Sequence, residues 1–184
     1  GFGYQGSASR KGWSQDVAEL SIGSDLKSFL QEPGQWTMGI MGFGEMLPYH
    51  ENQISLDKTT KDKWGLPVLA IDCEIKDNEH KMRIDMMNDA AEMLTAGGLK
   101  DVKTYDRGYA PGMGIHEMGT ARMGLDPKTS VLNGNNQLWD CKNVFVTDGS
   151  CMTSAACVNP SLTYMALTAR AADFAVNELK KGNL

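Results

Sequence analysis

The sequence lacks both a cluster of basic residues and a long hydrophobic run. Lys and Arg total 18 against 23 Asp and Glu, which gives a net charge of −5 at pH 7 over 184 residues. Because affinity for nucleic acids and anionic membranes depends on neutralising phosphate charge, this balance argues against both as partners. No window approaches the run of about 18 apolar residues that a transmembrane helix needs, so we expect a soluble protein without a membrane span.

Cysteine is scarce, and the four cysteines form no recognisable motif. Their spacing contains neither a CxxC redox pair nor a doubled zinc-knuckle pattern; they are Cys73, Cys141, Cys151 and Cys157. We expect buried free thiols and no metal site, since no compact set of His and Cys completes a ligand sphere. These cysteines leave the compartment open between the cytoplasm and the periplasm.

An initiator methionine and a signal peptide are also missing from the start of the chain. Gly1 opens directly into a stretch of Gly, Ser and aromatic residues, with no basic segment followed by an apolar one. We therefore expect the 184 residues to belong to a longer polypeptide. Hydrophobic residues at 41% and charged residues at 22% are ordinary globular usage, so we expect the chain to fold.

The apolar periodicity of the first half predicts an α+β lobe. Residues 1–35 indicate a loop followed by a helix or irregular structure. Strand-like runs follow at 36–43, 53–56 and 67–75. We expect an antiparallel sheet of four to six strands with helices covering one face. Helical spacing over 78–96 predicts a helix that Gly97 and Gly98 end, and its methionines are interpreted as core residues.

The C-terminal part of the sequence predicts one buried strand and one long helix. Residues 143–148 form an apolar run ending in a carboxylate, which is typical of a parallel strand buried on both faces. The helix has Asn159 as its expected N-cap, Pro160 at its first position and a stop at 180–182.

Three glycines at the start of the chain match a dinucleotide fingerprint. Gly1, Gly3 and Gly6 satisfy G-x-G-x-x-G, but that motif binds pyrophosphate only between a preceding strand and a following helix. The sequence predicts neither element here, so we interpret the match as chance.

His116 is the histidine with a functional context. It lies between YAPGMG and EMGTARMG, where four glycines within thirteen residues allow the backbone to approach a ligand closely. A zinc-protease site is excluded because HEMGT lacks the second histidine of H-E-x-x-H. An isolated histidine is more often structural than catalytic, so the functional interpretation depends on what accompanies it.

The motif HEMGTARMG occurs with several other segments in a defined order. They are GE-x-x-P at 44–48, KDKWGLP at 61–67, DGS at 148–150, and Asn159-Pro160 followed by Thr163. In this ordered combination, from about Trp36 onward, the sequence resembles the C-terminal part of the glucose-methanol-choline (GMC) family of FAD-dependent alcohol oxidoreductases.

The resemblance implies a catalytic pair. His116 occupies the position of the family's active-site base, and Asn159 occupies the position of its partner, where some members carry a second histidine. Members that share the His and Asn version, including those acting on pyranose sugars, show that asparagine is compatible with activity. The implied reaction is oxidation of a CH–OH group in a small alcohol or sugar by hydride transfer to FAD, with His116 taking the hydroxyl proton.

The resemblance also implies contacts to FAD. Asp148 and Gly149 fall where a buried strand end meets the cofactor, although a turn or cap role is the ordinary interpretation of such an aspartate. The start of the last helix is expected to face the flavin with its unpaired donors. The residues expected there are Pro160, Ser161, Leu162 and Thr163.

Two lobes follow from this resemblance. Residues 1–110 are expected to form a partial substrate-binding-type lobe, and residues 111–184 to contribute the active-site motif, a strand and a helix that complete an FAD-binding α/β domain. No convincing βαβ unit for adenine and pyrophosphate is present, so the expected partner is the N-terminal FAD-binding half of the same parent chain. We expect the 184 residues alone to be inactive and to hold little or no FAD.

Two other functions stay open, as does the electron acceptor among oxygen, a quinone and a cytochrome. A hydrolase could use Ser150, His116 and Asp148 as a triad, but no G-x-S-x-G elbow is present. Asp148 and Ser150 are also only two residues apart, which hinders both from meeting one imidazole. A non-catalytic module that binds sugars or a partner could keep the sheet alone, although the intact His116 and Asn159 argue against it.

Overall fold

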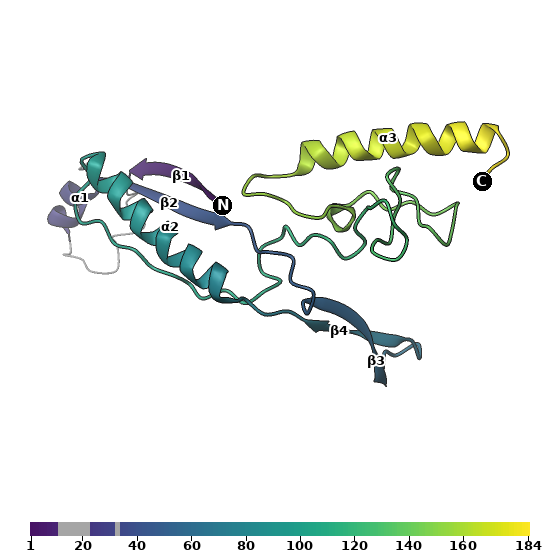
Figure 1. The fold of residues 1–184 in the computed structure, drawn as a ribbon. Coiled ribbons are helices and arrows are strands. Elements are labelled where there is room, and N and C mark those ends of the chain that lie inside the picture. The colour runs from purple at the N-terminus through teal and green to yellow at the C-terminus, as the bar shows by residue number, and fades with distance from the viewer. Residues whose placement is uncertain (11–22, 32–33) are drawn as a thin grey trace.

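The computed structural model describes residues 1–10, 23–31 and 34–184. Two pairs of antiparallel strands and three α-helices form the regular structure of these residues (Figure 1). In chain order the elements are β1 (Phe2–Arg10), α1 (Ser24–Gln31), β2 (Trp36–Gly44), β3 (Gln53–Lys61), β4 (Pro67–Asp72), α2 (Asp77–Ala96), the 3-10 turn η3 (Gly149–Cys151) and α3 (Ser161–Lys180). The expected α+β class is confirmed.

The strands form two separate sheets, so the expectation of one sheet with four to six strands is wrong for the described residues. β1 pairs with β2, from Phe2 opposite Gly44 to Arg10 opposite Trp36, and β3 pairs with β4. The alternation of apolar and polar residues along a strand shows which residues share a face of that strand. It does not show which strand pairs join into one sheet, because that depends on contacts between distant parts of the chain. The connection at 45–52 carries the chain away from β2 before β3 begins (Figure 1).

The first 35 residues contain a strand that the sequence did not predict. β1 includes Gly3 and Gly6 and no β-branched residue, so it depends on pairing with β2 rather than on local preference. These glycines lie within a strand, which confirms that their match to a dinucleotide loop is chance. A helix begins at Ser24, within the region where the sequence predicts a helix or irregular structure, while Val17 and Leu20 of the same periodic stretch lie outside the described residues.

α2 covers one face of the β1–β2 sheet with methionine side chains. A Cβ on Gly42 would lie 2.9 Å from the Met86 sulfur, and one on Gly44 would lie 2.5 Å from the Met82 methyl carbon. The Tyr4 hydroxyl donates a hydrogen bond of 2.8 Å to the Met86 carbonyl. Glycines in β2 therefore let the helix approach the sheet. Met82 and Met86 are half-buried against this face, whereas Met93 of the same helix is 46% exposed, so the interpretation of the methionines as core residues is wrong for Met93.

Glu79 fastens the start of α2 to the loop before β3. Its buried carboxylate accepts hydrogen bonds from four residues: from the N–H groups of Leu47 and Lys76, the Tyr49 hydroxyl and the Asn78 amide. Burial alone would raise the pKa of Glu79, but these hydrogen bonds outweigh it and hold the pKa at about 2. The carboxylate is therefore charged at neutral pH, and it joins the loop that contains Leu47 and Tyr49 to the start of α2.

The chain between 111 and 160 has little regular structure, and the predicted strand at 143–148 is wrong. In that segment Phe145 forms a single β-bridge, to Gln137, and about half of the residues are exposed. Backbone hydrogen bonds join 144–146 to 136–138 on one side. An apolar run becomes a doubly buried strand only where other strands flank it on both sides and helices cover it.

α3 begins one residue later than the sequence suggests. Its cap residue is Pro160 and its first helical residue is Ser161, so the expectation of Asn159 as the N-cap is wrong. No side chain at the cap accepts a hydrogen bond from the first turn. The helix ends as expected, with Lys181 as the C-cap and Gly182 at φ +76°.

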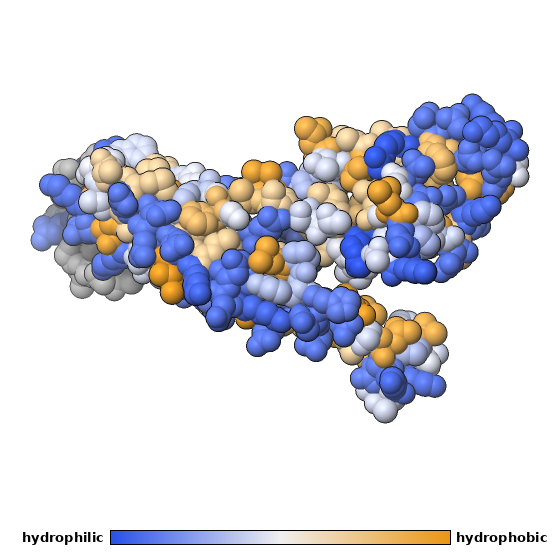
Figure 2. Space-filling model, viewed as in Figure 1, coloured by the Kyte–Doolittle hydropathy of each residue, from blue (hydrophilic) through white to orange (hydrophobic). Residues whose placement is uncertain are grey.

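The chain exposes more surface than a compact protein of its size. Its accessible area is 13821 Å², against about 8,700 Å² for a compact monomer of 20.1 kDa. Figure 2 shows hydrophobic residues at the surface, including on the β3–β4 hairpin. No helix in the described ranges is long and apolar enough to cross a membrane.

Candidate active site

The HEMGTARMG segment runs alongside the DGS turn. The N–H of Ala121 donates a hydrogen bond of 3.0 Å to the Ser150 carbonyl, and the N–H of Met123 donates one of 2.9 Å to the Cys151 carbonyl. Two motifs that are distant in the sequence are therefore joined through their backbones.

The first turn of α3 packs against the same place. The Tyr164 hydroxyl lies 3.5 Å from the Met118 sulfur. Gly149 fits beside both, because a Cβ there would lie 2.8 Å from the Tyr164 oxygen and 2.9 Å from the Met118 sulfur. Glycine at this position is required by packing, and three segments that the sequence singled out meet at one point.

His116 is half-buried and follows a strained backbone position. Ile115 has a φ of +68°, a conformation that costs a β-branched residue about 1–3 kcal/mol. The loop around His116 is held by a hydrogen bond of 3.1 Å from the Gly114 N–H to the Glu117 carboxylate. Strain of this kind persists where the surroundings impose it, which is common at catalytic and binding sites.

Asn159 is exposed and lies immediately before the cap of α3. Contacts between this helix and the HEMGTARMG segment join Tyr164 to Met118 and Arg170 to Met123, and none is recorded between His116 and Asn159 themselves. The structure brings the two segments together, and the pairing of the two side chains stays a prediction.

The first turn of α3 presents open backbone donors. Pro160 is buried and offers no side-chain acceptor to this turn. Ser161, Leu162 and Thr163 are exposed, Leu162 to 79%. The unpaired N–H groups at the start of a helix favour an anionic or electron-rich group.

Asp148 caps the η3 turn. Its carboxylate accepts hydrogen bonds from the Ser150 N–H at 2.9 Å and from the Ser150 hydroxyl. The ordinary interpretation of Asp148 as a cap is confirmed, and its contact with a cofactor stays a prediction. A hydrolytic triad would need the Ser150 hydroxyl to donate to His116, but here the hydroxyl donates to the carboxylate.

Behind the DGS turn lies a buried polar contact that sequence analysis missed. Asn136 is fully buried at φ +63°, and its amide donates to the Val146 carbonyl at 3.0 Å. The Asn136 oxygen accepts a hydrogen bond of 3.2 Å from Arg170 of α3. The run NGNN predicts a turn with a positive φ, but nothing local signals that the turn is buried beneath a helix.

Burial raises the pKa of two groups beside the turn. The Cys151 thiol is fully buried, and its desolvation raises its pKa. Desolvation also raises the pKa of Tyr164, and the negative charge of Asp148 adds to the effect. Both groups are therefore uncharged at neutral pH.

The expectation of buried thiols is confirmed for Cys151 and wrong for Cys73 and Cys141, which are exposed, and Cys157 is half-buried. Cys73 follows the short strand β4 and Cys141 lies beside a turn, so neither has a covering element. In the part of the chain that the structure describes, no group of three or more His, Cys, Asp and Glu is placed to hold a metal ion.

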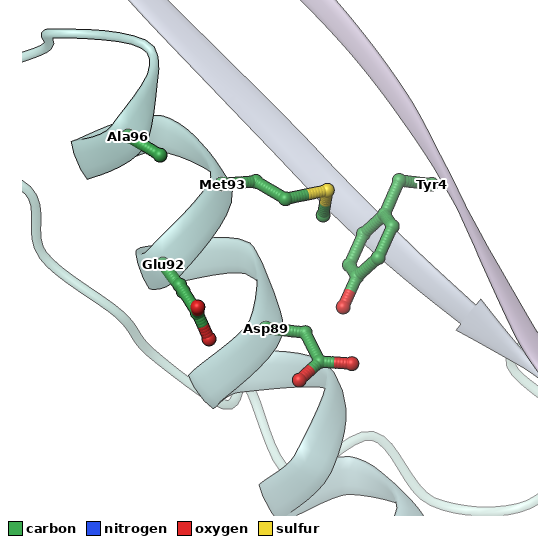
Figure 3. Close-up of a pocket in the computed structure, with 5 residues that line it drawn as sticks. All are labelled: Tyr4, Asp89, Glu92, Met93 and Ala96. Atoms are coloured by element: carbon green, nitrogen blue, oxygen red, sulfur yellow. The ribbon is translucent and has the colours of Figure 1, made fainter.

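A shallow groove of about 300 Å³ lies elsewhere, between α2 and β1 (Figure 3). Tyr4 reaches from β1 toward the helix, and the helical side is lined by Asp89, Glu92, Met93 and Ala96. The groove contains none of the predicted site residues. We assign it no part in the candidate active site.

Comparison with known proteins agrees with the motifs. A sequence profile of the family described as GMC oxidoreductase matches residues 48–168. A 2-methyl-1,2-propanediol dehydrogenase of Mycolicibacterium austroafricanum is 41% identical over 155 residues, covering 82% of this chain and 27% of the relative.

Two other relatives are named for different substrates. A C-glycoside 3-oxidase of Arthrobacter globiformis is 29% identical over 70% of this chain and 25% of the relative. A gluconate 2-dehydrogenase flavoprotein of Pantoea cypripedii is 30% identical over 79% of this chain and 25% of the relative. The chain spans about a quarter of the length of these relatives. From the profile match and the ordered motifs, we conclude that the chain belongs to the GMC oxidoreductase family.

Proposed function

We propose that the chain forms the C-terminal part of a flavin-dependent oxidoreductase that oxidises a CH–OH group in a small alcohol or sugar. Family membership supports this reaction class, and the relatives are named as dehydrogenases and an oxidase. The observation that carries the proposal is the meeting of the HEMGTARMG segment, the DGS turn and the first turn of α3.

His116 acts as the base in this proposal. Oxidation of an alcohol removes a hydroxyl proton, and an imidazole titrates close enough to neutral pH to accept it. The half-buried position of His116 shields it partly from water while leaving access for a substrate. Asn159 has no titratable group, so its amide orients the substrate oxygen and stabilises developing negative charge.

The described residues fit a flavin at the start of α3. No side chain at the cap satisfies the first-turn N–H groups, and the residues of that turn are exposed. Bound FAD would accept the hydride from the substrate carbon. The N–H groups after Pro160, at Ser161, Leu162 and Thr163, would donate to the electron-rich side of the cofactor, beside Asp148 and Gly149.

The N-terminal part of the same polypeptide is the proposed partner for FAD binding. The chain spans about a quarter of the length of its relatives. Between 1–10, 23–31 and 34–184, the structure contains antiparallel strand pairs and no βαβ unit that could hold the pyrophosphate. The 184 residues therefore supply the catalytic segment and one wall of the flavin site.

Anaerobic reduction of the full-length protein tests this proposal. The purified protein is mixed without oxygen with a panel of simple alcohols, sugars and sugar acids, and the flavin absorbance is followed. We expect bleaching by at least one alcohol or sugar, and none by its O-methyl ether at the reacting carbon, because the ether has no hydroxyl proton for His116. Retention of flavin without bleaching by any member would instead indicate a binding module. Purification without flavin would contradict the cofactor assignment.

A further inference from the structure

The β3–β4 hairpin has an exposed apolar face. The register pairs Ile54 with Ile71 and Leu56 with Leu69. Because side chains alternate across a strand, these four lie on the same face of the hairpin. Their exposed fractions are 40% for Ile54, 69% for Ile71, 62% for Leu56 and 61% for Leu69.

The opposite face is more polar. Gln53 pairs with Asp72, and Ser55 pairs with Ala70. The hairpin is therefore amphipathic in register, as a sheet is when one face packs and the other meets water. Figure 2 shows it projecting from the rest of the molecule, with hydrophobic atoms on its surface.

The hairpin is shaped by its own hydrogen bonds. At its tip, the Asp62 carboxylate accepts hydrogen bonds of 2.9 Å from the N–H groups of Trp64 and Leu66. At its base, Asn52 and Glu74 exchange hydrogen bonds of 3.1 and 3.0 Å between the Asn52 amide and the Glu74 backbone. Trp64 and Leu66 in the turn at the tip are also exposed, to 74% and 62%. These hydrogen bonds define the shape of the hairpin, which has one apolar face.

The amount of exposed surface indicates what covers this face. A two-stranded hairpin is marginally stable in water unless it packs against another element. The chain exposes about 5,000 Å² more than a compact monomer would. This excess is larger than the area of roughly 1,000–2,500 Å² that each partner contributes to an obligate interface. Contact between the hairpins of two copies would cover only a small part of it, whereas the relatives have about three quarters of their length outside the matched region.

We propose that the apolar face of the β3–β4 hairpin is a docking surface for the part of the same polypeptide that lies outside these 184 residues. The occupant is an apolar surface of that part, and the contact is intramolecular. This inference goes beyond the proposed function, because a catalytically inactive relative would need the same packing.

Leu69→Lys in the full-length protein tests the docking surface, with Ser55→Lys as the matched control on the polar face. Hydrogen–deuterium exchange over 53–72 and the thermal midpoint are measured for both variants. We expect Leu69→Lys to speed exchange in the hairpin at least 10-fold and to lower the midpoint, because it places a charge in an apolar interface. We expect Ser55→Lys to leave both quantities at the values of the unmodified protein.

A milder pair keeps the test decisive if Leu69→Lys yields no soluble protein. Leu69→Ala and Ser55→Ala are then compared in the same way, and we expect only the first to speed exchange. Equal exchange in both variants and in the unmodified protein would overturn the proposal. Protection of the hairpin that rises with protein concentration would also overturn it, because it would identify a second copy as the occupant.

Discussion

Different kinds of contact stabilise the two halves of the molecule internally. In β1, β2 and α2, side chains of regular elements pack on one another, as Met86 does on Gly42. Between 111 and 160, short backbone and cap hydrogen bonds hold irregular segments, as between Ala121 and Ser150. The candidate site lies at the surface of the irregular half, where His116 is half-buried and Asn159 is exposed. Substitutions there should change chemistry more than folding, and substitutions under α2 should do the reverse.

His116→Ala in the full-length protein should have the largest effect and should sharpen the comparison. Loss of a general base lowers the rate of flavin reduction by about 10²–10⁴-fold. FAD content and thermal midpoint should change little, because the side chain is only half-buried. Anaerobic stopped-flow reduction and the ratio of FAD to protein measure these quantities. His80→Ala, an exposed histidine in the other half, is the control, and an unchanged reduction rate in His116→Ala would contradict the assigned role.

Glu79→Ala should show the opposite pattern. Removing the carboxylate leaves the N–H groups of Leu47 and Lys76 without their acceptor, so we expect the free energy of unfolding to fall by about 2–4 kcal/mol. Turnover per FAD-loaded molecule should be unchanged. Urea denaturation measures the stability, and Glu92→Ala, an exposed glutamate on the same helix, provides the control. Equal stability of the two variants would show that the hydrogen bonds of Glu79 do not stabilise the fold.

The pH dependence of stability should report Glu79 as well. Its pKa is about 2 in the folded chain and near its ordinary value of 4.5 when unfolded, so the unfolded state binds a proton first as pH falls. The stabilisation is complete above about pH 5 and is lost progressively toward pH 2. Across this pH range, the midpoint of urea denaturation should change less for Glu79→Gln than for the unmodified chain. Equal changes in the two proteins would show that Glu79 does not cause the pH dependence.

Gly149→Ala should have a moderate effect where the two motifs meet. The new methyl group would lie 2.8 Å from the Tyr164 hydroxyl and 2.9 Å from the Met118 sulfur, so one of them must move. We expect a loss of about 1–3 kcal/mol in the free energy of unfolding, together with reduced flavin occupancy in the full-length protein. Gly134→Ala in the same half is the control, because no atom lies within 4 Å of its Cβ position.

Tyr164→Phe should have the smallest effect by itself. The hydroxyl makes one weak contact, to the Met118 sulfur, so we expect a change below about 1 kcal/mol. Combined with Gly149→Ala, it should recover part of the lost stability by removing the atom nearest the new methyl group. A double-mutant cycle measures this coupling, and strictly additive effects would show that the turn relaxes without moving Tyr164.

The regular half was predicted more fully than the irregular half. The spacing over 78–96 agrees with α2, and the run at 36–43 agrees with β2, because each pattern repeats with the period of its own element. β1 was missed because its glycines carry no strand preference and its partners in β2 lie 26 residues (Arg10 to Trp36) to 42 residues (Phe2 to Gly44) further along the chain. In the irregular half, the segment at 143–148 has the composition of a buried strand but lacks flanking strands on both sides.

In the candidate site, too, the sequence pointed to some residues and missed others. Motif order selected His116, Asp148 and Asn159 as candidates, because a family's residue types can be recognised without coordinates. Asn136 and Met118 were missed, because burial beneath α3 and contact with Tyr164 leave no local pattern.

The sequence by itself determined the places of α2, α3, β2, β3 and β4, the cap role of Asp148 and the membership of the GMC oxidoreductase family. These depend on residue type and short-range spacing, which any stretch of chain carries within itself. Only the tertiary structure decided that the strands form two sheets and that Gly149 must lack a side chain. Those features arise from contacts between residues far apart in the chain, whose energies no local pattern records.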